Sequence, residues 1–255
     1  MKYSNMNKLP VPVLAWSRPE NIPFPNVWNR FKSRPKNGKS CNIKIVDLTP
    51  DRYEEAIQFM AKYFLMDEPL RSSVKFLDDM NDTIRYLHAL KTAIETRTSI
   101  LAVLDEDVAA PEIVGIQILY VSTNGDPSIR HFHDPGEKIR KVKRIANDLM
   151  NAADPYEILG TDRLLRGFGL CVKPDYRGMD IGYNLLLCLE KLAKAYDVKG
   201  CMNMYSRIQS QVLAERVGFK VYNEVFYEDY KDEKGNALFP IKHTKSFKLM
   251  GIKYA

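Results

Sequence analysis

The sequence predicts an α/β domain built on a mixed sheet, and three observations carry this prediction. Strand-like and helical segments alternate between residues 164 and 227, as they do where helices connect the strands of one sheet. Residues 99–104 and 113–121 are two β-branched runs around a turn-rich segment, which is typical of an antiparallel hairpin. The chain has 255 residues, enough for a full hydrophobic core, so we expect one main domain.

The first regular elements lie before residue 100. Residues 43–48 have the pattern of a short strand, and the Thr-Pro-Asp at 49–51 supplies the cap, first-turn proline and acidic first turn of a helix. A break is expected at residues 67–70, because a residue that precedes proline avoids the helical conformation. A second helix should cover residues 79–95.

The second half of the chain is more regular. Residues 137–151 have apolar side chains on one helical face, within a region (122–161) that has no strand signal. A strand at 164–172 leads through a loop to a helix at 181–196, whose expected buried face is Leu185, Leu189, Leu192 and Tyr196. The remaining predicted elements are strands at 200–205, 221–227 and 245–253 and a helix at 206–217.

Composition excludes several classes of protein. Hydrophobic residues make up 45% and charged residues 27% of the chain, as in ordinary globular proteins. No apolar run approaches the roughly 20 residues of a membrane-spanning helix, and the first residues do not resemble a secretory signal. The four cysteines form neither a CxxC pair nor a zinc-like spacing. We therefore expect a cytoplasmic protein, with reduced thiols and no membrane partner.

Basic residues are concentrated near the N-terminus. Residues 1–40 contain eight lysines and arginines and one glutamate, so they carry +7 while the rest of the chain carries −1. Such a segment can attract nucleic acid, but its spaced prolines and the lack of an aromatic–basic strand motif favour an extended arm over the domain. We expect a basic, proline-rich arm at 1–40, a domain at 41–255 and no nucleic-acid partner.

Residues 169–187 form a strand, a glycine-bearing loop and the start of a helix. The N–H groups of such a loop and of the first helical turn lack partners, and the helix dipole adds positive potential, so this arrangement binds pyrophosphate. Neither GxGxxG nor GxxxxGK[ST] is present, which disfavours dinucleotide and P-loop sites.

The loop resembles the acetyl-CoA loop of the GCN5-related N-acetyltransferases (GNAT). The matching residues are Val172, Pro174, Tyr176, Arg177, Ile181 and Gly182. Residues 214–219 (AERVGF) resemble a second signature of the superfamily, and the resemblance covers roughly residues 42–255. It implies a GNAT fold: a twisted mixed sheet of about seven strands, flanked by helices, whose splayed central strands form the acyl-CoA cleft.

The resemblance also implies which residues hold acetyl-CoA. They are Cys171, Val172, Arg177, Gly178, Met179, Asp180, Ile181, Gly182 and Tyr183. No metal is implied. Asp180 departs from the family, which has a glycine there. Aspartate is among the few other residues that tolerate positive φ, but its carboxylate would lie near the pyrophosphate and weaken binding unless it points outward.

Three further pieces resemble insect arylalkylamine N-acetyltransferases: residues 63–70 (YFLMDEPL), the serine pair Ser206 and Ser210, and a late histidine. By this resemblance, Glu68 is the general base and the serines lie beside the thioester. His243 lines the amine pocket, with Asp67 as a lesser candidate there.

Several of these residues also have plainer interpretations. Glu68 could be a solvated loop carboxylate, and Ser206 could cap a helix with Gln209 completing the capping box. Tyr205 is a substitute for Ser210 as the group that protonates the leaving thiolate. Cys171 has apolar neighbours, which disfavours a nucleophilic role. The H-x-H pair at 131 and 133 has no third ligand at useful spacing, so we expect no metal.

The expected function is transfer of an acetyl group from acetyl-CoA to the primary amine of a small arylalkylamine-like substrate, by direct attack in a ternary complex. Residues 79–95 and 122–161 should form the acceptor pocket. Aromatic walls would suit an arylalkylamine, whereas acidic walls would suit a polyamine. The alternatives are a polyamine, amino-acid or peptide acyltransferase, or a catalytically weak acyl-CoA-binding protein. We expect a monomer or weak dimer.

Overall fold

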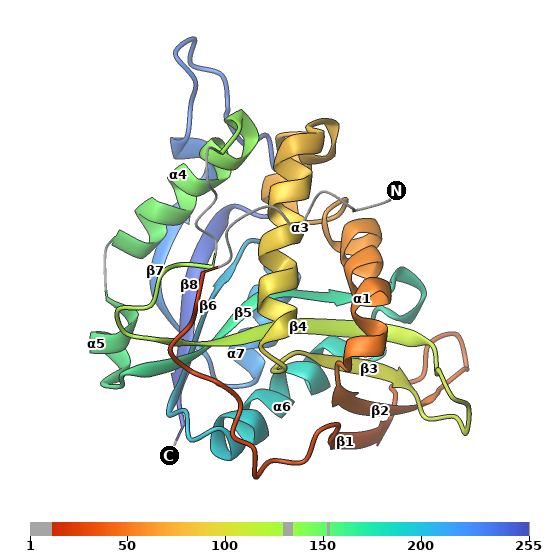
Figure 1. Ribbon diagram of the computed structural model, residues 1–255. Helices are drawn as coiled ribbons and strands as arrows, with labels where there is room; N and C mark the ends of the chain where they lie inside the picture. The colour runs from red at the N-terminus through yellow and green to blue at the C-terminus, as the bar shows by residue number, and fades with distance from the viewer. Residues whose placement is uncertain (1–11, 130–134, 152–153, 255) are drawn as a thin grey trace.

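The computed structural model describes residues 12–129, 135–151 and 154–254, and its described part is built on one mixed sheet (Figure 1). The sheet has eight strands in the order β1-β2-β3-β4-β5-β6-β8-β7, and only β5 and β6 pair in parallel. The strands are β1 (Val27–Lys32), β2 (Asn42–Asp47), β3 (Ile100–Leu104), β4 (Ile113–Thr123), β5 (Arg163–Val172), β6 (Gly200–Tyr205), β7 (Lys220–Phe226) and β8 (Ser246–Lys253). The predicted α/β class and mixed sheet are confirmed.

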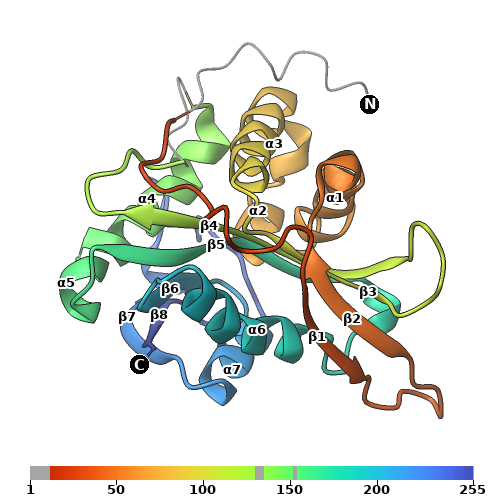
Figure 2. The same cartoon turned by 60° about the horizontal axis from the view of Figure 1, so that its bottom comes forward.

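Helices cover both faces of the sheet. They are α1 (Tyr53–Phe59), α2 (Pro69–Ser73), α3 (Met80–Glu95), α4 (Glu137–Asn151), α5 (Pro155–Leu159), α6 (Ile181–Ala195) and α7 (Ile208–Arg216). Figure 2 shows α1, α2, α3 and α4 on one side of the sheet and α6 and α7 on the other. Separate apolar clusters fill the two interfaces, and the predicted inner face of α6 is buried as expected.

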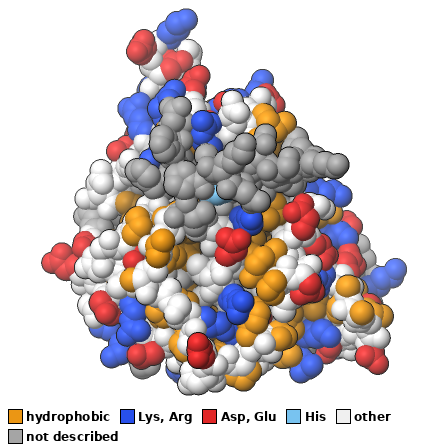
Figure 3. Space-filling view, in the orientation of Figure 1, with side chains coloured by type: hydrophobic (Ala, Val, Ile, Leu, Met, Phe, Trp, Pro, Cys, Tyr) orange, Lys and Arg blue, Asp and Glu red, His pale blue; other side chains and the backbone are white. Residues whose placement is uncertain are grey.

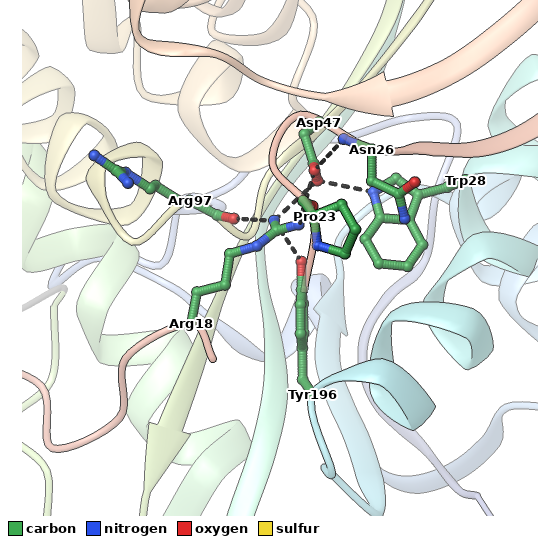
Figure 4. A network of polar contacts seen from close by, with 7 residues as sticks. All are labelled: Arg18, Pro23, Asn26, Trp28, Asp47, Arg97 and Tyr196. Atoms are coloured by element: carbon green, nitrogen blue, oxygen red, sulfur yellow. Dashed lines mark hydrogen bonds and ion pairs between the residues drawn. The ribbon is translucent and has the colours of Figure 1, made fainter. Parts of the chain in front are cut away.

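Strand β1 lies within the segment expected to be an arm. It pairs with β2 along the sheet edge, so the sheet begins before residue 41 and has one strand more than the seven expected. The residues just before β1 are also anchored. Arg18 forms a two-pronged ion pair with Asp47 and donates to the carbonyls of Pro23 and Arg97 (Figure 4).

The two central strands separate after a short parallel contact. β5 and β6 pair only at Leu164–Gly200 and Leu165–Cys201, while β4 continues to pair with β5 up to Val172. A bulge at Phe168 shifts the register of β5. Asn203 of β6 reaches into the gap and accepts a hydrogen bond from the backbone N–H of Gly167. The splay expected from the GNAT resemblance is therefore present.

Helix boundaries differ from the sequence-based expectation, and two of the differences bear on the site. Pro69 begins the short helix α2 instead of only interrupting one, because proline fits the first helical position and Glu68 caps it. Helix α7 begins at Ile208 with Arg207 as its N-cap, so the expected cap at Ser206 is wrong. The N–H of Ile208 donates to the hydroxyl of Thr244, which takes over the capping role.

Acidic and basic side chains are interspersed on the face shown in Figure 3, where the described side chains do not gather by sign. No helix in the described part of the chain is long and apolar enough to cross a membrane.

Candidate active site

A cavity of about 580 Å³ lies where β5 parts from β6. It is lined by the loop before α6, the start of α2 and the start of α7. The predicted residues that line it are Asp67, Glu68, Cys171, Val172, Arg177, Gly178, Asp180, Ile181, Gly182, Tyr183, Ser206 and Ser210. Two predicted residues do not line it: Met179 is buried beside it in the core, and His243 is exposed.

The loop before α6 forms a cradle of backbone N–H groups. Gly178 and Asp180 both have positive φ, at 83° and 61°, so Asp180 takes the conformation that the family glycine supplies. Within the described structure, the N–H groups of residues 178–183 have no hydrogen-bond acceptor in the protein. Together with the dipole of the 15-residue helix α6, they form a site suited to a pyrophosphate.

Asp67 links two arginines beside this cavity. Its carboxylate lies 2.9 Å from Arg177 and 2.8 Å from Arg207. Arg177 also donates from Nε to the carbonyl of Val172 at 3.0 Å. Each carboxylate oxygen of Asp67 is thus paired with an arginine. The sequence had instead suggested that Asp67 binds the substrate amine.

Glu68 is a buried capping residue, with 6% of its surface exposed. Its two oxygens accept hydrogen bonds from the backbone N–H groups of Leu70 (3.2 Å) and Arg71 (3.0 Å). One oxygen also pairs with the Arg71 guanidinium at 2.8 Å. The solvated loop carboxylate considered from the sequence is therefore wrong: Glu68 lines the cavity, and three donors hold its carboxylate in place.

The two serines line the same cavity near the start of α7. Ser210 donates from its hydroxyl to the carbonyl of Arg207 at 2.7 Å, which leaves the oxygen lone pairs available. Ser206 accepts at its backbone carbonyl from the hydroxyl of Tyr227. Tyr205 does not line the cavity: its ring packs on Phe219 in the core, and burial raises the pKa of its phenol. It is therefore no substitute for Ser210.

Cys171 lines the cavity but is poorly suited to attack a thioester. Burial raises the pKa of its thiol to about 12, so almost none of it is thiolate at neutral pH.

No model of a protein family matches the sequence, and no curated protein matches it. Solved structures do match. Arylalkylamine N-acetyltransferase 7 from the yellow fever mosquito Aedes aegypti is 26% identical, with a TM-score of 0.83, and the match covers 93% of this chain and 99% of that one. The fold is that of the GCN5-related N-acetyltransferases. The expected likeness to insect arylalkylamine N-acetyltransferases is confirmed.

More distant matches share the GNAT fold. Arylalkylamine N-acetyltransferase 2 from Aedes aegypti is 20% identical with a TM-score of 0.73, covering 84% of this chain and 99% of that one. The Drosophila melanogaster polyamine N-acetyltransferase is 15% identical with a TM-score of 0.68, covering 83% and 99%. At these identities the likeness concerns the fold.

The structure has a second cavity, of about 360 Å³, that Glu68 does not line. It is lined by Phe76 and residues of α3, of the segment 122–161 and of β5 and β6, so the two segments expected to form an acceptor pocket do line a cavity. Arg71 contributes to its wall, whereas its ion-pair partner Glu68 lines the first cavity. The Glu68–Arg71 pair therefore stands between the two spaces.

Arg71 was not singled out from the sequence. A signal was present, because Arg71 follows Glu68 by three residues and Pro69 lies between them, which is typical of a helix start with an i, i+3 ion pair. Burial lowers the pKa of Arg71, but Tyr86 and Glu68 raise it and the net shift is upward, so the guanidinium stays charged. The described residues contain no group of three or more metal-binding side chains, and His131 and His133 lie outside the described residues.

Proposed function

We propose that this protein transfers an acetyl group from acetyl-CoA to the primary amine of a small arylalkylamine-like substrate, by direct attack within a ternary complex. The observation that carries the proposal is one ion pair whose two members line different cavities. Glu68 lines the cavity at the splay and Arg71 lines the second one, so we place the thioester in the first cavity and the amine in the second, next to this pair.

The first cavity suits acetyl-CoA. The N–H groups of residues 178–183 would hold the pyrophosphate, and Arg177 and Arg207 add positive charge beside Asp67. Among the described residues, β5 has no strand partner on its β6 side beyond Leu165. Residues 170–172 of β5 line the cavity there, and their backbone groups would bond the extended arm of the cofactor. Acetyl-CoA supplies a thioester as acyl donor.

The acceptor ammonium must lose a proton before its nitrogen can attack. Glu68 is held in place to take that proton, directly or through one water. The C–N bond then forms as the C–S bond breaks, and the leaving thiolate takes up a proton. Ser210, which lines the same cavity, is our candidate for the hydroxyl that contacts the sulfur, together with Ser206.

An amine panel tests the proposal. The protein is incubated with acetyl-CoA and, separately, 2-phenylethylamine, spermidine, agmatine, a short peptide or no amine, and CoA thiol and acetylated product are measured. We expect amine-dependent thiol release with an arylalkylamine and little with the polyamines. Thiol release from spermidine alone would shift the assignment to a polyamine acetyltransferase. CoA binding without any product would leave an acyl-CoA-binding protein.

A further inference from the structure

The second cavity is positively charged. Its wall carries Arg71, Lys143 and Arg166, and no aspartate or glutamate of the described residues lines it. A diamine or polyamine would bring a second positive charge into this space and be repelled. The charge therefore favours an acceptor that carries a negative group in addition to its amine.

Two of the three cations have no acidic partner among the described residues. Neither Arg166 nor Lys143 forms an ion pair there, and Arg166 lies 4.0 Å from the sulfur of Met150. Two basic residues of the same elements that do not line the cavity have acidic partners. Arg163, on the same strand, contacts Asp162 and Asp197, and Lys141, on the same helix as Lys143, contacts Glu137.

Arg71 is charged, largely buried and only partly satisfied. Its side chain is 13% exposed and gives one guanidinium N–H to Glu68, while its buried Nε has no hydrogen-bond partner among the described residues. A buried donor without a partner costs free energy, and this cost is recovered when a ligand supplies an acceptor. A carboxylate is the acceptor that matches a guanidinium best, and the guanidinium of this wall that is unpaired among the described residues is that of Arg166, whereas Arg71 already holds Glu68.

Three aromatic side chains stand in the wall among aliphatic and small polar ones. Phe76, Tyr86 and Tyr120 line the cavity, and its volume of about 360 Å³ is in the range of small-molecule sites. Aromatic side chains favour a flat ring between the amine and the negative group.

We propose that the acceptor is a small aromatic amine that carries a carboxylate at the end of the molecule opposite the amine. The amine lies at Glu68, and the carboxylate lies in the part of the cavity lined by Arg166 and Lys143. This inference rests on the proposed function and names the substrate class for the same site.

A matched pair of acceptors tests it: 4-(2-aminoethyl)benzoate and its neutral amide, 4-(2-aminoethyl)benzamide. The two differ in charge but hardly in shape. We expect kcat/KM for the benzoate to exceed that for the benzamide by about tenfold or more, as a charge-assisted contact would give. Arg166→Gln should reduce this preference to about twofold or less, while Arg163→Gln, on the same strand but paired with acids, should keep it.

The outcomes separate this inference from the proposed function. Equal turnover of both amines, or a preference that survives Arg166→Gln, would overturn the carboxylate assignment while acetyl transfer stands. If neither amine is acetylated, calorimetric titration of both into CoA-saturated protein decides: tighter binding of the benzoate, lost in Arg166→Gln, supports the inference, and equal affinities contradict it. Absence of CoA binding would instead contradict the proposed function.

Discussion

At the scale of single residues, environment decides which of the candidate groups can react. Cys171 and Glu68 line the same cavity, but Cys171 is a thiol whose pKa burial raises, whereas Glu68 is a carboxylate held by three donors. The sequence could indicate both as candidates by resemblance. It could not show that Arg71 pairs with Glu68 and divides two cavities, because that depends on where α2 packs.

Cys171→Ser should leave acetyl transfer within about threefold, because a thiol whose pKa is raised to about 12 by burial is not an effective nucleophile at neutral pH. Between pH 7 and 10, iodoacetamide labelling of native Cys171 should accelerate about tenfold per pH unit, since only the thiolate reacts. Mass spectrometry after incubation with acetyl-CoA alone gives the check. An acetyl group found on Cys171 would require a covalent intermediate.

At the scale of elements, the start of α6 was largely predictable and the start of α7 was not. The spacing of apolar residues defines the buried face of α6, and the tolerance of aspartate for positive φ explains Asp180, which has φ of 61°. Helix α7 is capped by Thr244, which lies 36 residues away in sequence, and no local pattern around Ser206 can show that. Strand β1 was missed for a similar reason, since its pairing with β2 arises in the fold.

Substitution of Asp180 tests how the α6 cradle works. Asp180→Gly should lower the KM for acetyl-CoA about two- to tenfold, because it removes a negative charge beside the proposed pyrophosphate site and relieves a positive φ. Asp180→Asn separates the two causes, since asparagine keeps the tolerance for positive φ without the charge. Steady-state kinetics measures both. An unchanged KM in both variants would mean that the carboxylate points away from the cofactor.

At the scale of the whole molecule, the segment before β1 is tied to the sheet by a buried ion pair. The Arg18 and Asp47 side chains are 6% and 0% exposed, and Asp47 also accepts from the Trp28 indole and the Asn26 N–H (Figure 4). The composition of residues 1–40 suggests a solvated arm. It could not predict the Arg18–Asp47 pair, because charge and proline content do not show which basic residue has a buried acidic partner in the fold.

Asp47→Ala should lower the free energy of unfolding by about 3–5 kcal/mol, because it leaves the Arg18 guanidinium buried without its partner. Urea denaturation measures the loss. Asp105→Ala is the control: its pairs with Arg30 and Lys44 lie nearer solvent, with 28% of the Asp105 side chain exposed, so the cost should stay below about 1 kcal/mol. Equal losses of unfolding free energy in the two variants would show that the buried Arg18–Asp47 pair stabilises the fold no more than a more exposed pair does.

The central claim is that a small amine loses its proton at Glu68, whose ion-pair partner Arg71 lines the second cavity, and the pH dependence of Glu68→Gln tests it most directly. Asp154→Asn is the matched control, because Asp154 also caps a five-residue helix that begins with proline but lies outside both cavities. We predict that Glu68→Gln keeps CoA binding and loses about 10²- to 10⁴-fold in kcat/KM at pH 7, with a smaller loss at high pH, where more amine arrives deprotonated. Asp154→Asn should match the wild type. A Glu68→Gln enzyme within about twofold of the wild type, with an unchanged pH profile, would contradict the account.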